Sequence, residues 1–285
     1  MLSVLRTTLI AMLCDLNVPW PGDFTRKPSA DEIRRLRQVV VTLSHLGYTH
    51  IAFNLTVPGD SKITLPQPID VSIVKDIPIK VFTRITLIVL DPAQCHLIAK
   101  LNNQFDLISI QPESEKALIF AAGLDIDIIT FALGVKLPYY LKHKTVCGAT
   151  DKGIKFELPY AAMVMGYEPL VLTPVGLPRT NFFYNAHQLI RLLRSRGLIA
   201  SLGAQALSQC RSGHDITVLL KTLGLDSARA KATVSDNPER ALLRGRLRIK
   251  LYKQTVEPVD RDRKRGGDTD AVRLLKRAKL GAKQS

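Results

Sequence analysis

Long apolar runs are missing from this 285-residue sequence. No stretch of about 18 apolar residues occurs, so we expect no membrane-spanning helix and no membrane partner. The cysteines Cys14, Cys95, Cys147 and Cys210 are far apart and form no C-x-x-C or Cys/His pattern of the kind that binds zinc. Their spacing favours plain buried thiols in a reducing compartment.

Glycine-rich phosphate loops and aromatic RNA-binding motifs are also absent. No predicted strand is followed by a dinucleotide-binding fingerprint or a Walker loop, which disfavours an open, nucleotide-binding sheet. The aromatic signatures of RRM, KH and OB domains do not occur either, so sequence-specific base reading is not indicated. If the chain binds RNA, recognition of shape and phosphate fits better.

Positive charge is abundant, and it is concentrated at the C-terminal end. The formal net charge is +15, and residues 241–285 hold 14 of the 40 basic residues but only 5 of the 25 acidic ones. Clustered positive charge gains affinity for polyanions by releasing counterions from phosphates, so a polyanionic partner is the leading hypothesis. The alternative is a charged tail that only keeps the protein in solution.

Helix and strand patterns alternate along most of the chain. Residues 29–47 predict a helix, with a capping box at Ser29 and Glu32, a shared apolar face and a stop at Gly47. A first strand runs into Asp15, and further strands are expected at 49–57, 79–90, 105–110, 125–131, 154–160 and 198–204. Helices are expected between them, among them 137–153, 181–197, about 213–223 and about 226–235.

These alternating elements predict a TIM-like (β/α) barrel. Seven strands separated by helices leave room for an eighth element, and residues 79–90 are apolar on both faces except at Thr83, Arg84 and Thr86. Strands of that kind belong to a sheet covered on both sides. We expect an N-terminal extension at 1–11, the barrel at 12–254 and a basic tail at 255–285 that is disordered when free.

Asp15 and Asn17 are unusual residues for the end of an apolar strand. Strand alternation places both on one side, at the end where α/β folds carry their working groups. Arg84 lies in an apolar strand and is the natural partner for such groups, because a desolvated arginine needs a carboxylate. We therefore expect Asp15 and Asn17 either to cap loops or to pair with basic groups at the barrel mouth. The alternative for Arg84 is that it points into solvent at a strand end.

Two groups of basic residues are candidates for RNA contact. Arg191, Arg194 and Arg196 lie near the end of a predicted helix, where they bind phosphate or simply stabilise the helix dipole. Arg244, Arg246, Arg248 and Lys250 occupy alternate positions. If the segment is extended, all four face one way and follow an RNA backbone, whereas in a helix they scatter.

The tail contains two basic clusters with the spacing of a bipartite nuclear-import signal. The first cluster is Arg261, Arg263, Lys264 and Arg265, and the second is Lys276, Arg277 and Lys279. This spacing predicts a nuclear location.

Seven motifs in this order resemble a known family. They are DLNVPWP (15–21), LGYTHIAFN (46–54), RITLIVLDP (84–92), DLISIQPESEKAL (106–118), LDIDIITF (124–131), GIKFEL (153–158) and SRGLIASLGA (195–204). As a set they resemble the thirty-kilodalton protein subunit of nuclear ribonuclease P and ribonuclease MRP, in its fungal form, over about residues 12–250. Members usually begin close to Met12, and the loop at 161–180 has no counterpart that we place.

The resemblance implies a fold and a function. It implies a TIM-like barrel related to the polymerase and histidinol phosphatase metal hydrolases, in a non-catalytic subunit that binds a catalytic RNA. The implied partners are that RNA, precursor tRNA indirectly, other subunits and a small ferredoxin-like-fold protein subunit. The implied location is the nucleus and nucleolus. No cofactor is expected on this chain, and Mg²⁺ is expected for the catalytic RNA.

The alternative function is a metal-dependent phosphoesterase of the related barrel superfamily. That superfamily opens with a His-x-His pair, whereas this chain has Asp15, Leu16 and Asn17 at the corresponding place. The histidines do not supply a replacement: His45, His96, His143 and His187 fall in predicted helices, His50 begins its strand at the wrong end, and His214 lies in a late loop. We therefore expect no metal site and no catalytic residue. A third hypothesis is a general RNA or chromatin binder.

Overall fold

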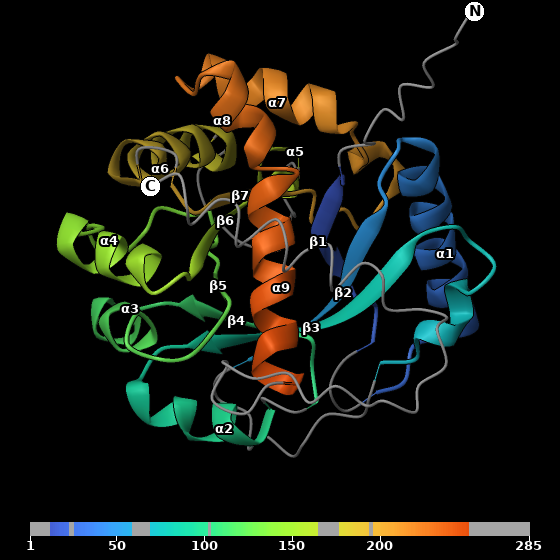
Figure 1. Ribbon diagram of the computed structural model, residues 1–285, viewed down its shortest axis with the longest axis horizontal. Helices are drawn as coiled ribbons and strands as arrows, with labels where there is room; N and C mark the ends of the chain where they lie inside the picture. The colour runs from blue at the N-terminus through green and yellow to red at the C-terminus, as the bar shows by residue number, and fades with distance from the viewer. Residues whose placement is uncertain are drawn as a thin grey trace, which may run out of the picture.

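Seven parallel strands, arranged in chain order, form the single sheet at the centre of the protein (Figure 1). The computed structural model describes residues 12–22, 26–58, 69–101, 104–164, 177–193 and 196–250, without the side chains of 96, 97, 99, 100, 177, 178 and 250. The strands are β1 (Cys14–Pro19), β2 (His50–Val57), β3 (Lys80–Val89), β4 (Leu107–Pro112), β5 (Ile128–Ile129), β6 (Lys155–Pro159) and β7 (Leu198–Ser201). The predicted TIM-like α/β fold is confirmed.

Helices surround the sheet and connect consecutive strands (Figure 1). The α-helices are α1 (Ala30–His45), α2 (Ile98–Leu101), α3 (Glu115–Ala121), α4 (His143–Asp151), α5 (Ala161–Val164), α6 (Leu177–Leu193), α7 (Gly213–Thr222), α8 (Ser227–Ala232) and α9 (Asp236–Lys250). Three 3₁₀ turns, η1 (Val71–Val74), η2 (Pro92–Leu97) and η3 (Leu207–Gln209), complete the connections. Across the described segments, no helix has the length and apolar character needed to cross a membrane.

The first helix follows the sequence closely. Ser29 accepts a hydrogen bond from the Glu32 backbone N–H (3.3 Å), and the Glu32 carboxylate accepts one from the Ser29 N–H (2.7 Å). This reciprocal pair satisfies donors that a helix start leaves open. Gly47 then takes a positive φ of 87°, which a side chain would disfavour, and the chain turns into β2.

Two predicted elements are shorter than the sequence suggests. The helix expected at 137–153 begins only at His143, because Tyr139 donates its hydroxyl to the Pro112 carbonyl (2.6 Å) and holds the preceding segment at the end of β4. The strand expected at 125–131 has ladder pairing only at Ile128–Ile129. Just before it, the carboxylate of Asp127 accepts the Ile108 backbone N–H (2.9 Å) in place of a strand carbonyl.

The barrel closes at a seam between β1 and β7, where the described residues form no strand ladder. The turn between α8 and α9 bridges part of it: Val234 accepts the N–H of Cys14 (3.0 Å), and Thr233 accepts the N–H of Ala200 (3.1 Å). This turn is the eighth element for which the sequence left room.

The helix α9 closes the end of the barrel at which the strands begin. Figure 1 shows it running across the strands. Its Ala241 and Leu242 pack inside the barrel in a small apolar cluster with side chains of the strands, namely Cys14, Leu16, Ala52, Phe82, Leu107, Ile128 and Ile199. A larger apolar core lies between the strands and the surrounding helices.

Candidate functional site

A buried ion pair fills the middle of the barrel. The side chains of Arg84 on β3 and Glu157 on β6 both have 0% exposure, and the guanidinium contacts both carboxylate oxygens at 2.6 Å. Burial opposes ionisation of Glu157, but the charge and hydrogen bonds of Arg84, with smaller contributions from Thr130 and Ser201, together outweigh it and hold the pKa of this carboxyl below its ordinary value. Two charges therefore persist in the interior because each neutralises the other.

All five N–H donors of Arg84 have acceptors. Besides Glu157, the guanidinium donates to the Leu16 carbonyl (2.8 Å), to the Ser109 hydroxyl (3.0 Å) and to the Thr86 hydroxyl (3.3 Å). These partners come from β1, β4 and β3. The guanidinium thus ties four strands together, which is a structural role.

Asn17 joins this network indirectly. The Thr86 hydroxyl donates to Asn54 Oδ1 (2.7 Å), and Asn54 Nδ2 donates to Asn17 Oδ1 (2.8 Å). A chain of hydrogen bonds thus leads from Arg84 to the loop end of β1. The sequence prediction that Asn17 and Arg84 meet in one polar cluster agrees with this arrangement.

Asp15 does not pair with Arg84, which was one of the two arrangements that the sequence left open. The register of β1 against β2 shifts between Asp15 and Val18: Asp15 pairs with Ile51, and Val18 pairs with Phe53. Ile51 and Phe53 belong to the larger apolar core between the strands and the helices. This irregularity breaks the strict alternation of side chains along β1, so the Asp15 side chain does not join Asn17 in the network around Arg84. The carboxylate of Asp15 instead accepts the backbone N–H groups of Leu202 (3.1 Å) and Asn17 (3.2 Å). The loop-capping alternative is therefore the one the structure shows.

Asp15 closes the barrel seam. Its bond to Leu202, just past β7, connects β1 to β7 where no ladder joins them. Burial raises the pKa of Asp15 to about 6, and the nearby Glu157 charge adds to this, while the two backbone donors and Arg84 oppose it. Its second oxygen, Oδ2, is buried and has no hydrogen-bond partner among the described residues. The carboxyl is thus held at an energetic cost in its ionised form.

The described residues at the mouth do not form a site for a catalytic metal ion. The place of a metal-ligating His-x-His pair holds Asp15, Leu16 and Asn17, of which only Asp15 is charged and it faces the seam. The carboxylate nearest the centre, Glu157, is neutralised by a guanidinium. Throughout the described ranges, no group of three or more His, Cys, Asp or Glu side chains is placed to hold a metal. Divalent ions need several free oxygen or nitrogen donors, which this centre does not offer.

The segment that contains Arg244, Arg246 and Arg248 is helical, so the extended, one-sided arrangement is wrong. Arg248 pairs with the buried Asp127 (2.9 Å) and Arg244 with Asp125 (2.8 Å), and Arg244 also donates to the Lys152 carbonyl. Arg246 lies over the Phe82 ring, 5.2 Å from its centroid. These three contacts fix α9 against the strand starts, and Lys250 ends that helix.

The other predicted basic residues have different surroundings. Arg191, in the last turn of α6, and Arg196 are exposed. Arg194 lies outside the described residues, as do the seven import-signal residues, Arg261, Arg263, Lys264, Arg265, Lys276, Arg277 and Lys279. The structure thus brings Arg84 and Asn17 together and leaves Arg191 and Arg196 on the surface.

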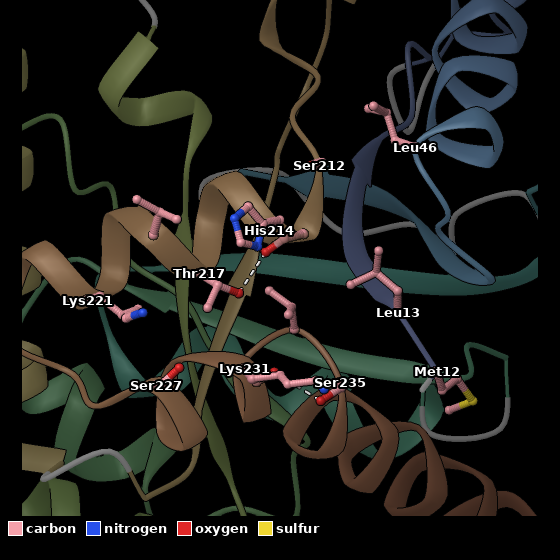
Figure 2. Close-up of a pocket in the computed structure, with 13 residues that line it drawn as sticks. Met12, Leu13, Leu46, Ser212, His214, Thr217, Lys221, Ser227, Lys231 and Ser235 are labelled. Carbon is pink, nitrogen blue, oxygen red and sulfur yellow. Dashed lines mark hydrogen bonds between the residues drawn. The ribbon is translucent and has the colours of Figure 1, made fainter. Parts of the chain in front are cut away.

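A surface pocket of about 420 Å³ lies near the seam, beside the start of β1. Figure 2 shows Met12 and Leu13 from this region facing His214, Thr217 and Lys221 of α7. His214 is therefore helical rather than in a loop as predicted. The Thr217 hydroxyl donates to the Gly213 carbonyl of its own helix (2.7 Å), and the Ser235 hydroxyl, in the turn after α8, donates to the Lys231 carbonyl (2.9 Å). The pocket therefore presents no set of converging catalytic groups.

The sequence is matched by one family model, described as RNase P subunit p30, over residues 12–250. The chain belongs to this family. Ribonuclease P/MRP protein subunit RPP1 of Saccharomyces cerevisiae is 37% identical over 256 residues, which cover 86% of this chain and 84% of the yeast protein. Ribonuclease P protein subunit p30 of Mus musculus is 28% identical over 265 residues, covering 88% and 95%. The family resemblance drawn from the seven motifs is confirmed.

Solved structures show the fold of the family. A chain in a cryo-EM structure of archaeal ribonuclease P with mature tRNA superposes with a TM-score of 0.61 at 16% identity, over 88% of this chain and 100% of that chain. The ochratoxinase of A. niger superposes with a TM-score of 0.55 at 9% identity, over 81% and 71%. At these identities the likeness concerns the barrel alone and carries no activity with it.

Glu157 is the site residue that the sequence interpretation did not assign. An acid inside the strand KFELP carries the same signal as Arg84 inside KVFTRITLIV, namely a charge in a buried strand. Pairing the two would have required the barrel order, in which β3 and β6 face each other across the interior. In this barrel the two charges at the centre neutralise each other and have a structural role.

Proposed function

We propose that this chain is a non-catalytic, RNA-binding protein subunit of ribonuclease P and ribonuclease MRP. In these roles it supports a catalytic RNA in the 5′ maturation of precursor tRNA and in the processing of precursor rRNA. The observation that carries the proposal is the family match over residues 12–250, which spans the whole described barrel. The relatives named as ribonuclease P or MRP subunits support it.

The composition of the barrel mouth supports a non-catalytic role. A phosphoesterase would need free donors for a metal ion or a water nucleophile at the loop end of the strands. Glu157 is neutralised by Arg84, and Asp15 is a single buried carboxylate at the seam whose Oδ1 already accepts two backbone N–H groups. Mg²⁺ in the particle then acts on the RNA, and this chain binds no cofactor of its own.

Further parts of the proposal concern partners and location. The chain contacts the catalytic RNA directly and precursor tRNA through it, and it assembles with the particle's other protein subunits, including a small ferredoxin-like-fold subunit. The two basic clusters between residues 261 and 279 direct it to the nucleus and nucleolus. Removing residues 255–285 from a fluorescent fusion is expected to reduce nuclear accumulation; an unchanged distribution would remove the import signal from the proposal.

The RNA that accompanies the chain tests the function. The full chain is tagged, the native complex is purified at moderate salt, and its RNA is sequenced. We expect strong enrichment of the ribonuclease P and MRP RNAs over all others. RNAs recovered in proportion to their abundance would favour a general RNA or chromatin binder, and a complex without RNA would favour the phosphoesterase alternative.

A further inference from the structure

The outward face of α6 carries aromatic and basic side chains that the fold does not use. Phe183 is 41% exposed and Tyr184 is 58% exposed. His187 and Arg191 are exposed one and two turns further along the same helix. Large aromatic side chains normally bury most of their area, so two adjacent exposed rings call for an explanation.

Helix geometry brings these residues onto one surface. Tyr184, His187 and Arg191 are separated by three and four positions, which places them in a row along one side. The opposite side of α6 is buried through Phe182, Ala186, Leu189 and Leu193. Seven residues at 1.5 Å each put Tyr184 and Arg191 roughly 10 Å apart along the helix. Phe183 flanks this row, and its ring is fixed edge-on against buried Phe182 at 5.7 Å between centroids.

The charged residues of α6 itself have one sign. Residues 177–193 contain no Asp or Glu. Asn181 donates to the Gly134 carbonyl (3.2 Å), and Asn185 donates to those of Leu133 (3.0 Å) and Val135 (2.9 Å), which ties the loop before α4 to this helix. That loop adds the exposed Lys136, and the start of α6 adds the exposed Arg179.

These cations contrast with two arginines of α1. There, Arg34 pairs with Asp31 on its own helix, and Arg37 pairs with Asp76 near η1. On α6 and its loop, the side chains of Lys136, Arg179, His187 and Arg191 form no hydrogen bond or ion pair with any residue in the described part of the chain. The charges of Lys136, Arg179 and Arg191 are therefore available to a partner, and His187 adds a polar ring beside them.

We propose that this α6 surface, defined as Phe183, Tyr184, His187 and Arg191 with Lys136 and Arg179 beside them, binds single-stranded RNA. Unpaired bases stack on the exposed rings, and the neighbouring phosphates contact the cations. Stacking on aromatic side chains combined with a basic track is how proteins hold single strands without reading their sequence. A duplex keeps its base faces covered and offers only phosphates. The inference rests on the proposed function and names the contact surface on this chain.

The test uses the purified full chain with a fluorescently labelled, unstructured 12-nucleotide RNA and with a duplex of the same length. Binding is measured by anisotropy over a range of salt concentrations. Tyr184→Ala is expected to weaken single-strand binding by about fivefold to a hundredfold, the equivalent of one lost stacking contact. Tyr184→Phe keeps the ring and is expected to bind like the wild type. Arg191→Ala is expected to lower the salt slope by about 0.7, as for one phosphate contact on a single strand.

Matched controls remove the same chemical groups elsewhere. Tyr140 is 77% exposed on the loop before α4, and Arg35 is exposed on α1. Tyr140→Ala and Arg35→Ala are expected to leave single-strand affinity within about twofold of the wild type, since both lie outside the α6 surface. Because Tyr184 and Arg191 are exposed, all these variants are expected to fold, and circular dichroism checks this.

Three results would overturn the inference. One is unchanged RNA affinity in both Tyr184→Ala and Arg191→Ala. Another is an equal loss of affinity for the single strand and for the duplex in Tyr184→Ala, which would mean that charge rather than stacking accounts for the binding. The third is unchanged RNA affinity together with loss of a protein subunit from the native complex of Tyr184→Ala, which would make this a protein-binding face. If sequencing identifies the ribonuclease P and MRP RNAs but the anisotropy measurements show no effect of the α6 variants, only the proposed surface is wrong. If the α6 variants lose RNA affinity but sequencing finds other RNAs, the surface binds RNA in a different particle.

Discussion

Replacing Arg84 with lysine tests the account of the barrel interior. The substitution keeps the positive charge beside Glu157 but loses the planar fork that contacts both carboxylate oxygens at 2.6 Å. A lysine has three N–H donors in place of five, so at least two of the hydrogen bonds to Glu157, Leu16, Ser109 and Thr86 are lost. At about 0.5–1.5 kcal/mol for each bond, the free energy of unfolding should fall by about 1–3 kcal/mol.

Urea denaturation of the full chain, followed by circular dichroism, measures this change. Arg84→Met provides the stronger perturbation, because it leaves Glu157 buried without a counter-ion, which costs about 3–5 kcal/mol. Adding Glu157→Leu to that variant should recover part of the loss, since no buried charge then remains. An Arg84→Lys protein as stable as the wild type, with reduced RNA binding, would refute the reasoning and move Arg84 to the RNA interface.

Three further predictions follow from the seam, α9 and the mouth. The pKa of Asp15 is raised to about 6, so the contribution of this carboxyl to stability falls as the pH rises from about 4 to about 6. Over this range the wild type should lose up to about 3 kcal/mol of stability relative to Asp15→Asn, as read from urea titrations of both proteins. A pH-independent difference between the two would contradict it. Arg248→Ala should lower the free energy of unfolding by up to about 3 kcal/mol, because the buried Asp127 then keeps only the more distant Arg244 (3.9 Å) as a counter-ion. An unchanged urea midpoint would argue against this role for Arg248. The purified chain should hydrolyse no phosphate ester or RNA with Mg²⁺, Mn²⁺ or Zn²⁺, and turnover that disappears in Asp15→Ala would restore the phosphoesterase alternative.

The sequence predicted the fold well because local signals and the barrel pattern agree. The Ser29 capping box, the apolar face of α1 and the alternation of strands with helices all appear in the structure. Arg84 could be singled out as a buried charge from its apolar strand alone. These features depend on neighbours in the sequence, and such neighbours are what a sequence shows directly.

The contacts between distant elements were harder to predict. Asp15 and Glu157 were both carboxylates that could have paired with Arg84. Choosing between them required knowledge of the register irregularity in β1, which the residue types do not indicate. The conformation of α9 was left open, because Arg244, Arg246 and Arg248 at alternate positions suit a strand as well as a helix. Their acidic partners, Asp125 and Asp127, lie over a hundred residues away, as the hydrogen bonds from Arg244 and Arg248 show.

The central claim is that this chain belongs to a particle whose RNA cleaves precursor tRNA. The most direct test is to purify the native complex through a tag on the full chain and to assay 5′ cleavage of a precursor tRNA in Mg²⁺, before and after nuclease digestion of the bound RNA. The account predicts cleavage at the 5′ end of the mature tRNA that disappears when the RNA is digested. Cleavage that survives complete removal of the RNA, or its absence from a complex that retains the RNA and all its protein subunits, would contradict it.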